Sequence, residues 1–311
     1  MAEPYSIVAG AVLGGALVRA NSCTVAATQR LVEGGRADWL VGIVIVIGWA
    51  GVTLSSVALA LPGLVEMPPD FVLAWNAVAG GVVLGLGAAV NRGCFLGSLA
   101  QFARGHLGYG LTLVGIGAAM AILATGWFSS WAPDAVPRTD PGLGQATSIS
   151  ANFAIFLLPS LYGAWRWWRR RSATLLALIF VGISGGAIYA CNPAWSYAGS
   201  FFRLSQSRPS LSSISAEAPA IALLLGALAS AMTAHRFNLQ VPRWRAAPAH
   251  LGGGFLMAVG AQIIPGGNDT LMLWAIPGLT LYGVTAYAAM IVTIAALLMA
   301  RRASGARRSL A

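Results

Sequence analysis

Apolar residues occupy the chain in long blocks, interrupted by short polar or glycine-rich stretches. Nine blocks approach the roughly 20 residues with which an α-helix crosses the hydrocarbon core of a bilayer. They cover residues 5–20, 38–62, 71–90, 108–128, 149–168, 172–190, 217–236, 250–265 and 278–300. The pattern predicts an all-α integral membrane protein with nine transmembrane helices.

Four shorter apolar pieces lie between these blocks, near residues 21–34, 92–104, 192–204 and 267–276. Each has about 10–14 residues, a length that enters a bilayer but does not cross it. Backbone at membrane depth must keep its hydrogen bonds inside the protein. The four pieces are therefore expected to be re-entrant half-helices.

The four pieces belong to an internal repeat. Each follows a glycine-rich helix and a polar break that contains asparagine. Cysteine stands in the first three breaks, at Cys23, Cys94 and Cys191, and Gly267 takes the equivalent place in the fourth. This regularity predicts a fourfold arrangement, in which discontinuous helices meet near the middle of the membrane.

The repeats divide the chain into two halves of one transport domain. The domain is expected to span residues 1–311, with two repeats in half 1 (1–128) and two in half 2 (149–300). The predicted topology puts the first two half-helices on the inner side of the membrane and the last two on the outer side. The halves are therefore expected to be inverted relative to each other.

Composition and charge support a membrane protein and suggest its orientation. Hydrophobic residues make up 57% of the chain and charged residues 9%, against about 25% charged in soluble domains. All 19 basic residues are arginine, and clusters such as Arg169–Arg171 and Arg301–Arg302 stand between or after apolar blocks. Such clusters mark the cytoplasmic side. We expect an N-terminus outside and a C-terminus inside a bacterial inner membrane, with Arg203 and Arg208 as exceptions, and no nucleic-acid partner.

Residues that cap helices stand in the breaks. The short helices can be capped by Asn21 or Ser22, by Asn192, and by Asn268 or Asp269, because their side-chain oxygens accept hydrogen bonds from the first backbone N–H groups. The capped N-termini would direct free N–H groups and the positive end of the helix dipole into the protein. Such a place suits an anion.

The second break reads VNRGCFLGSLAQF from residue 90. Asn91 and Gly93 are expected to turn the chain, so that Cys94 opens the short helix. Arg92 has two interpretations: it extends to the inner interface, or it attracts the anion at the cytoplasmic mouth.

The cysteines can be interpreted as packing residues or as functional residues. A buried cysteine is often a small apolar side chain that fills space, but three cysteines at one place of an internal repeat favour a shared role. A thiol is soft and a weak donor, and this suits a sulfur-containing anion better than sulfate or phosphate. Three widely spaced cysteines make a poor disulfide framework and match no zinc spacing, and no cofactor motif is found.

The sequence resembles the YeeE/YedE family of sulfur-transport membrane proteins. The resemblance rests on GVVLGLGAAVNRGCFLGSLAQFARG (81–105), AVLGGALVRANSCTVAA (11–27), GGAIYACNPAWSYAG (185–199) and GGFLMAVGAQIIPGGND (253–269). It implies an hourglass of helices in which essential cysteines pass thiosulfate through a constriction, and a small cytoplasmic sulfur-carrier protein that takes the delivered sulfur.

Carried over by repeat position, the resemblance places Cys23 and Cys94 on the cytoplasmic side of the constriction and Cys191 on the outer side. It also implies a transport cysteine in the last repeat, where this sequence has Gly267, Asn268 and Asp269. An ionised Asp269 beside an anion path would oppose the anion. It can instead cap a helix at the mouth, be neutral, or pair with Arg92.

Three functions remain open on the sequence. The leading prediction is an uptake permease for a small sulfur anion, thiosulfate first, or for another soft anion such as a selenium species. The second is a membrane thiol-redox or sulfur-transfer enzyme, and the third is a non-catalytic scaffold. The predicted substrate path comprises Cys23, Cys94, Cys191, Asn21, Asn91, Arg92, Gly93, Asn192, Gly267, Asn268 and Asp269.

Overall fold

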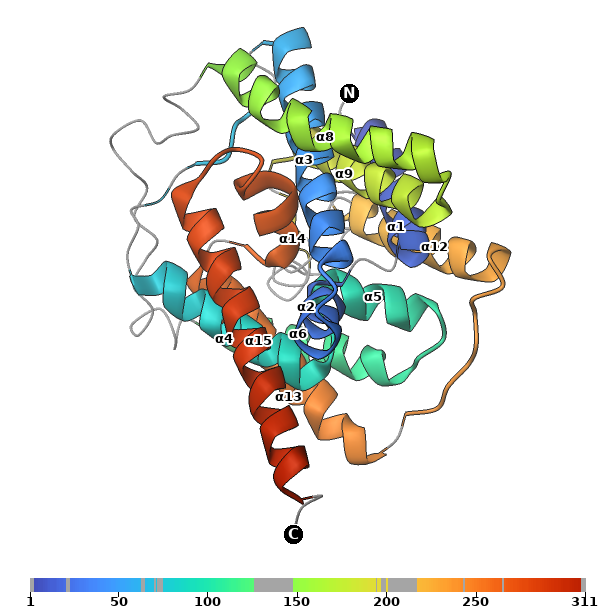
Figure 1. Cartoon of the computed structure of the whole chain (residues 1–311), viewed down its shortest axis with the longest axis vertical. Helices are drawn as coiled ribbons and strands as arrows, with labels where there is room; N and C mark the ends of the chain where they lie inside the picture. Colours follow the sequence, from blue (N-terminus) through green and yellow to red (C-terminus); the bar gives the residue numbers. More distant parts are fainter. Residues whose placement is uncertain are drawn as a thin grey trace.

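Helices account for the architecture of the computed structural model (Figure 1). The structure describes residues 3–20, 23–62, 65–69, 71, 75–125, 148–193, 195–196, 200, 217–242, 244–264 and 266–308, and within these ranges it contains no β-strand. The long helices are α1 (Glu3–Ala20), α3 (Asp38–Ala60), α4 (Trp75–Asn91), α6 (Gly108–Ala124), α8 (Ile149–Arg170), α9 (Ala173–Cys191), α12 (Ala218–Thr233), α13 (Ala247–Ile263) and α15 (Leu281–Arg308).

Short helices follow three of the four predicted breaks. They are α2 (Thr24–Gly34), α5 (Phe95–Ala103), and α14 (Asn268–Thr270) with its continuation η2 (Leu271–Ala275), a π-helical turn. Figure 1 shows α2, α5 and α14 near the middle of the view, among the longer helices. Most of the fourth piece, 192–204, lies outside the described residues.

Each of the nine predicted spans corresponds to one long helix, and the all-helical membrane class is confirmed. Within the described part of the chain, five helices are long and apolar enough to cross a membrane, or six if a pair bent by 56° around residues 264–267 counts as one span. Two of the five run from a long helix into the short one after it: Pro4–Gly34 and Trp75–Ala103. The count of nine spans and the re-entrant course of the short helices stay predictions.

The two halves of the sequence interlock. The most extensive helix contacts all join a helix before residue 128 to one after residue 148: α1 with α12 and α9, α3 with α9 and α8, α4 with α13 and α15, and α6 with α13. The helices that lead into the breaks, α1, α4 and α13, therefore each pack against helices of the other half.

Glycines allow these helices to approach closely. A Cβ added at Gly14 would overlap the carbonyl oxygen of Leu223 and lie 2.8 Å from the nitrogen of Ala227, in α12. At the crossing of α4 and α13, a Cβ at Gly87 would lie 2.6 Å from the nitrogen of Met257. Contact between backbones without side chains is the packing that membrane helices favour.

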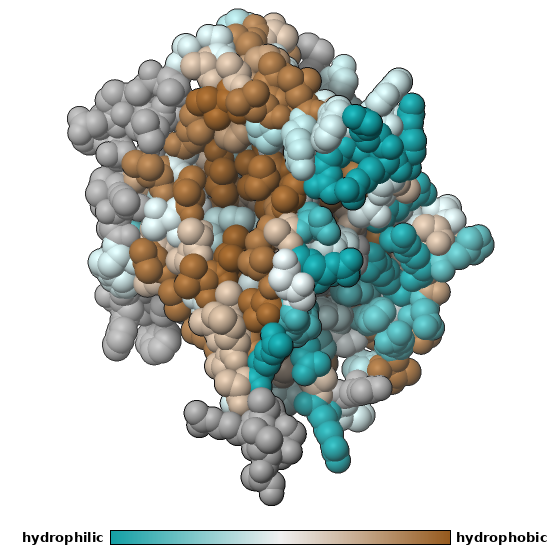
Figure 2. Space-filling view, in the orientation of Figure 1, coloured by the Kyte–Doolittle hydropathy of each residue, from teal (hydrophilic) through white to brown (hydrophobic). Residues whose placement is uncertain are grey.

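The surface separates apolar from polar side chains. Figure 2 shows apolar residues over much of the visible face and polar residues gathered on the right, where α8 and α12 end in Figure 1. Arg169, Arg170 and Arg171 are exposed at the end of α8. The Arg171 guanidinium lies 4.3 Å from the centre of the Trp168 ring, an arrangement typical of an aromatic and cationic belt at a membrane interface.

Candidate functional site

The second break is a tight turn that ends α4. Arg92 has a φ of 60°, and the Gly93 N–H donates to the Ala88 carbonyl at 3.1 Å. A left-handed residue followed by this backbone bond is the Schellman way of ending a helix. The sequence predicted that Asn91 and Gly93 turn the chain; between them, Arg92 takes the left-handed conformation. The Arg92 side chain is exposed.

Asn91 holds this break from inside the protein. Its buried side-chain amide donates to the Gly93 carbonyl at 2.8 Å and to the Ser98 hydroxyl at 2.7 Å. Its Oδ1 accepts from the Thr112 hydroxyl at 2.7 Å and lies 2.8 Å from Nδ1 of His250. Sequence reasoning missed Ser98, Thr112 and His250, although two hydroxyls inside apolar segments were a usable signal.

Two thiols meet at the N-termini of α2 and α5. Cys23 and Cys94 are the N-cap residues of these helices, which begin one residue later than predicted. Their Sγ atoms lie 3.6 Å apart, and Cys94 is only 1% exposed. Gly97 makes room for the pair, because a Cβ there would lie 2.6 Å from Sγ of Cys23. We call Cys23 and Cys94 the thiol pair.

The fourth break repeats the geometry of the second. The Gly266 N–H donates to the Ala261 carbonyl at 3.1 Å, as Gly93 does to Ala88, and Gly267 is the N-cap residue of α14. Gly267 therefore stands where Cys94 stands in the second repeat. This correspondence agrees with the repeat alignment drawn from the sequence.

Asn268 caps another helix than the one that the sequence predicted. Oδ1 of Asn268 accepts the N–H of Phe95 at 3.1 Å, so this residue caps α5 and not its own helix. Asp269 is fully buried, whereas the Arg92 side chain is exposed. Oδ1 of Asp269 lies 2.5 Å from where a Cβ on Gly267 would stand. The carboxylate thus occupies the place of the missing thiol.

A cysteine at position 267 is therefore expected to be harmful. In Gly267→Cys the new side chain meets the Asp269 carboxylate and, at 3.0 Å, the Phe95 ring, and overpacking of this kind costs about 1–3 kcal/mol. The melting temperature of the purified protein should fall. Gly267→Cys combined with Asp269→Ala should recover part of the loss, and a single variant as stable as the parent would contradict this account.

Cys191 and Asn192 are not brought to the thiol pair in the part of the chain that the structure describes. Cys191 is the last residue of α9, partly exposed, and hydrogen-bonds to neither Cys23 nor Cys94. Asn192 ends α9, and the helix that it was expected to cap lies outside the described residues, as does Asn21.

An aromatic cluster, which the sequence did not predict, packs against α14 and η2. The Tyr189 ring stacks on Trp274 with centroids 5.5 Å apart and meets Trp195 edge-on at 5.3 Å. The Tyr189 hydroxyl donates to the Thr270 hydroxyl at 3.0 Å. The buried indole N–H groups of Trp195 and Trp274 have no hydrogen-bond partner.

Two arginines hydrogen-bond to the C-terminal end of α1. Arg104, after α5, and Arg236, after α12, both donate to the carbonyl of Val18. Such bonds satisfy carbonyls at a helix C-terminus, where the dipole favours cations. Burial, and then the charge of Arg104, lower the pKa of His106 in the turn before α6.

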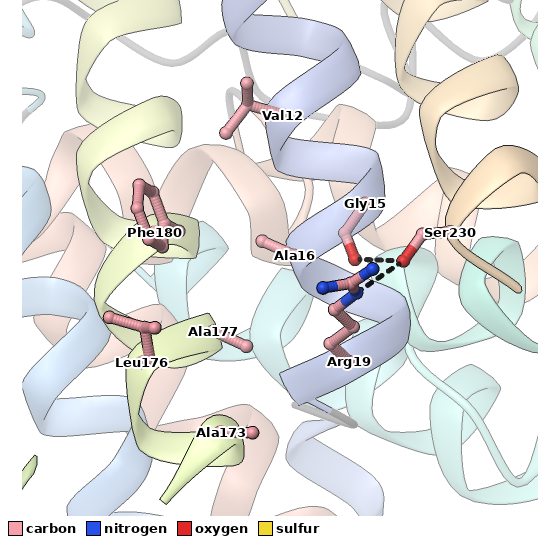
Figure 3. Close-up of a pocket in the computed structure, with 9 residues that line it drawn as sticks. All are labelled: Val12, Gly15, Ala16, Arg19, Ala173, Leu176, Ala177, Phe180 and Ser230. Atoms are coloured by element: carbon pink, nitrogen blue, oxygen red, sulfur yellow. Dashed lines mark hydrogen bonds between the residues drawn. The ribbon is translucent and has the colours of Figure 1, made fainter. Parts of the chain in front are cut away.

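A cavity of about 350 Å³ lies apart from the breaks, between α1, α9 and α12. Its lining is mainly apolar, with Val12 and Phe180 on facing helices (Figure 3). At one end Nε of Arg19 donates to the Ser230 hydroxyl at 3.1 Å, and this hydroxyl donates to the Gly15 carbonyl. No cysteine lines it, so it does not form part of the candidate site.

Comparison with known families identifies the class of protein. A family model described as sulphur transport matches residues 19–179 and again 174–296. The chain belongs to this sulphur-transport family. The first match contains the breaks at Cys23 and Cys94, and the second contains those at Cys191 and Gly267. No curated protein sequence matches the chain.

Membership agrees with the resemblance drawn from the sequence and makes the protein a multi-pass membrane transporter of sulfur. The family does not specify which sulfur compound is carried or which residues contact it. These questions depend on the geometry of the breaks.

Proposed function

We propose that this sulphur-transport protein is an uptake permease for a small sulfur-containing anion, thiosulfate above all. The observation that carries the proposal is the thiol pair: two sulfur atoms 3.6 Å apart at the N-termini of two short helices from different repeats. Neither helix has a side-chain cap from its own N-cap residue. N–H groups at these ends and the helix dipoles favour an anion.

The soft sulfur surface selects among anions. Thiols donate weakly and are polarisable, so they suit the terminal sulfur of thiosulfate better than the oxygens of sulfate. A narrow, dry contact with two thiols would replace part of the water shell of a sulfur atom at little cost. We infer that the terminal sulfur contacts the two thiols in turn as the anion moves along the path.

The path runs through the breaks, where the short helices are re-entrant and come from both faces of an inner membrane. Arg92 stands at the mouth on the arginine-rich side, which faces the cytoplasm, with the C-terminus inside and the N-terminus outside. Asn91 and Gly93 shape the turn before Cys94, Asn192 and Cys191 lie toward the outer side, and Asn21 precedes Cys23. A small sulfur-carrier protein in the cytoplasm would consume the product and keep the flux inward.

Uptake into proteoliposomes tests the proposal. Vesicles with the purified protein should take up radiolabelled thiosulfate faster than empty vesicles, and unlabelled selenosulfate should compete better than sulfate. No protein-dependent thiosulfate uptake would contradict the proposal. A scaffold would likewise show no flux of any anion.

The thiol pair also favours a second candidate, a thiol-redox enzyme. Sulfur atoms 3.6 Å apart could form a disulfide with release of two protons and two electrons, which an external acceptor such as a quinone must take. Disulfide turnover by mass spectrometry, at a rate matching substrate consumption, would support the enzyme. Thiosulfate flux through protein kept reduced would support the permease.

A further inference from the structure

Asn268 holds an unused hydrogen-bond donor at the N-terminus of α5. Its side chain is 1% exposed, and Oδ1 accepts the Phe95 N–H. This bond fixes which end of the amide is oxygen, and Nδ2 is left with no hydrogen-bond partner. A buried donor without a partner is rare in native proteins and commonly marks a bound ion or water.

The position of this donor links it to the thiol pair. Phe95, which Asn268 caps, directly follows Cys94, so the amide lies at the helix end that carries the Cys94 thiol. α5 has nine residues, which is long enough for its N-terminal N–H groups and dipole to favour negative charge. A thiol and an amide donor therefore stand together at one helix end.

We propose that Nδ2 of Asn268 binds an oxygen of the transported anion, while the thiol pair contacts its terminal sulfur. This inference rests on the proposed function and narrows its substrate class: an anion with a soft sulfur or selenium atom at one end and oxyanion oxygens at the other. Thiosulfate and selenosulfate have both ends. Hydrosulfide lacks the oxygens, and sulfate lacks the soft atom.

The same geometry explains why the fourth repeat has no thiol. The Asp269 carboxylate fills the space beside Gly267, and the donor in this repeat is instead an uncharged amide on the next residue. A neutral donor binds an oxyanion without holding it as tightly as a cation would. Hydrogen bonds to a charged partner are stronger than neutral ones, so the amide still discriminates.

Asn268→Asp separates the two roles of this side chain. The carboxylate keeps an acceptor for the Phe95 N–H but replaces the free donor with oxygen. Thiosulfate uptake by proteoliposomes at low concentration should fall by about 10- to 100-fold, a loss expected for one bond to a charged group. A second buried carboxylate beside Asp269 also costs stability, so uptake is compared at equal amounts of folded protein. Asn268→Ala, which removes cap and donor together, should lower both uptake and the melting temperature.

Uptake by Asn268→Asp within twofold of the parent would overturn the inference, because Asn268 would then act only as a cap. The unmodified protein gives a second measurement that does not depend on folding of a variant. Unlabelled selenosulfate should compete with radiolabelled thiosulfate far better than hydrosulfide or sulfate does. Equal competition by hydrosulfide would overturn the inference but leave the permease standing, whereas a parent without uptake would overturn both.

Discussion

Replacement of Cys94 by alanine is expected to reduce thiosulfate uptake by about tenfold or more, the effect of losing one hydrogen-bonding contact with an anion. Cys94 is buried at the N-terminus of α5, 3.6 Å from Sγ of Cys23. The substitution removes the sulfur atom from the helix end and leaves Cys23 without its neighbour. Uptake into proteoliposomes, compared at equal protein content, measures the effect.

Cys191→Ala is the matched control for this experiment. It removes the same atom from the end of α9, away from the thiol pair, and Cys191 is partly exposed. A smaller loss than in Cys94→Ala is therefore expected. Cys94→Ala with the uptake of the parent would show that a thiol relay is not how this permease works.

Replacement of Gly14 by valine is expected to prevent correct folding. The Cβ alone would overlap the Leu223 carbonyl in α12, and backbone atoms cannot move aside as a side chain end can. The cost should exceed the about 1–3 kcal/mol of ordinary overpacking. Size-exclusion chromatography in detergent should show aggregated or absent protein.

Gly117→Ala is the control, because it adds a side chain to a helix glycine that has no close neighbour. Gly117 is also a glycine inside a helix, but a Cβ there has no atom within 4 Å. Alanine in a helix interior is more favourable than glycine by about 1 kcal/mol. The melting temperature should therefore stay level or rise. A well-folded Gly14→Val protein would mean that α1 and α12 do not cross as closely as described.

The length of the apolar blocks made the helices predictable. The nine apolar blocks became α1, α3, α4, α6, α8, α9, α12, α13 and α15, with ends displaced by a few residues. The short helices within 21–34, 92–104 and 267–276 were predictable too, because glycine, asparagine and short apolar length act locally. The left-handed conformation of Arg92 between Asn91 and Gly93 was not predicted.

The fourth break shows where local reasoning fails. Asn268 was expected to cap the helix that it begins, a role set by neighbours in sequence, but it caps α5 from the opposite half of the chain. The carboxylate of Asp269 fills the place of a thiol beside Gly267. The residues near Asn268 in the sequence do not indicate that Phe95, 173 positions away, is its partner.

The sequence by itself determined the membrane class, the helices and the places of the cysteines, since each depends on composition and spacing along the chain. Only the tertiary structure decided that Cys23 and Cys94 form a pair and that Asn268 caps the N-terminus of α5 beside them. The reason is physical: contacts between sulfur, amide and backbone N–H groups extend over about 3 Å and join segments far apart in the chain. Their partners are fixed by how α1, α4 and α13 cross the helices of the other half.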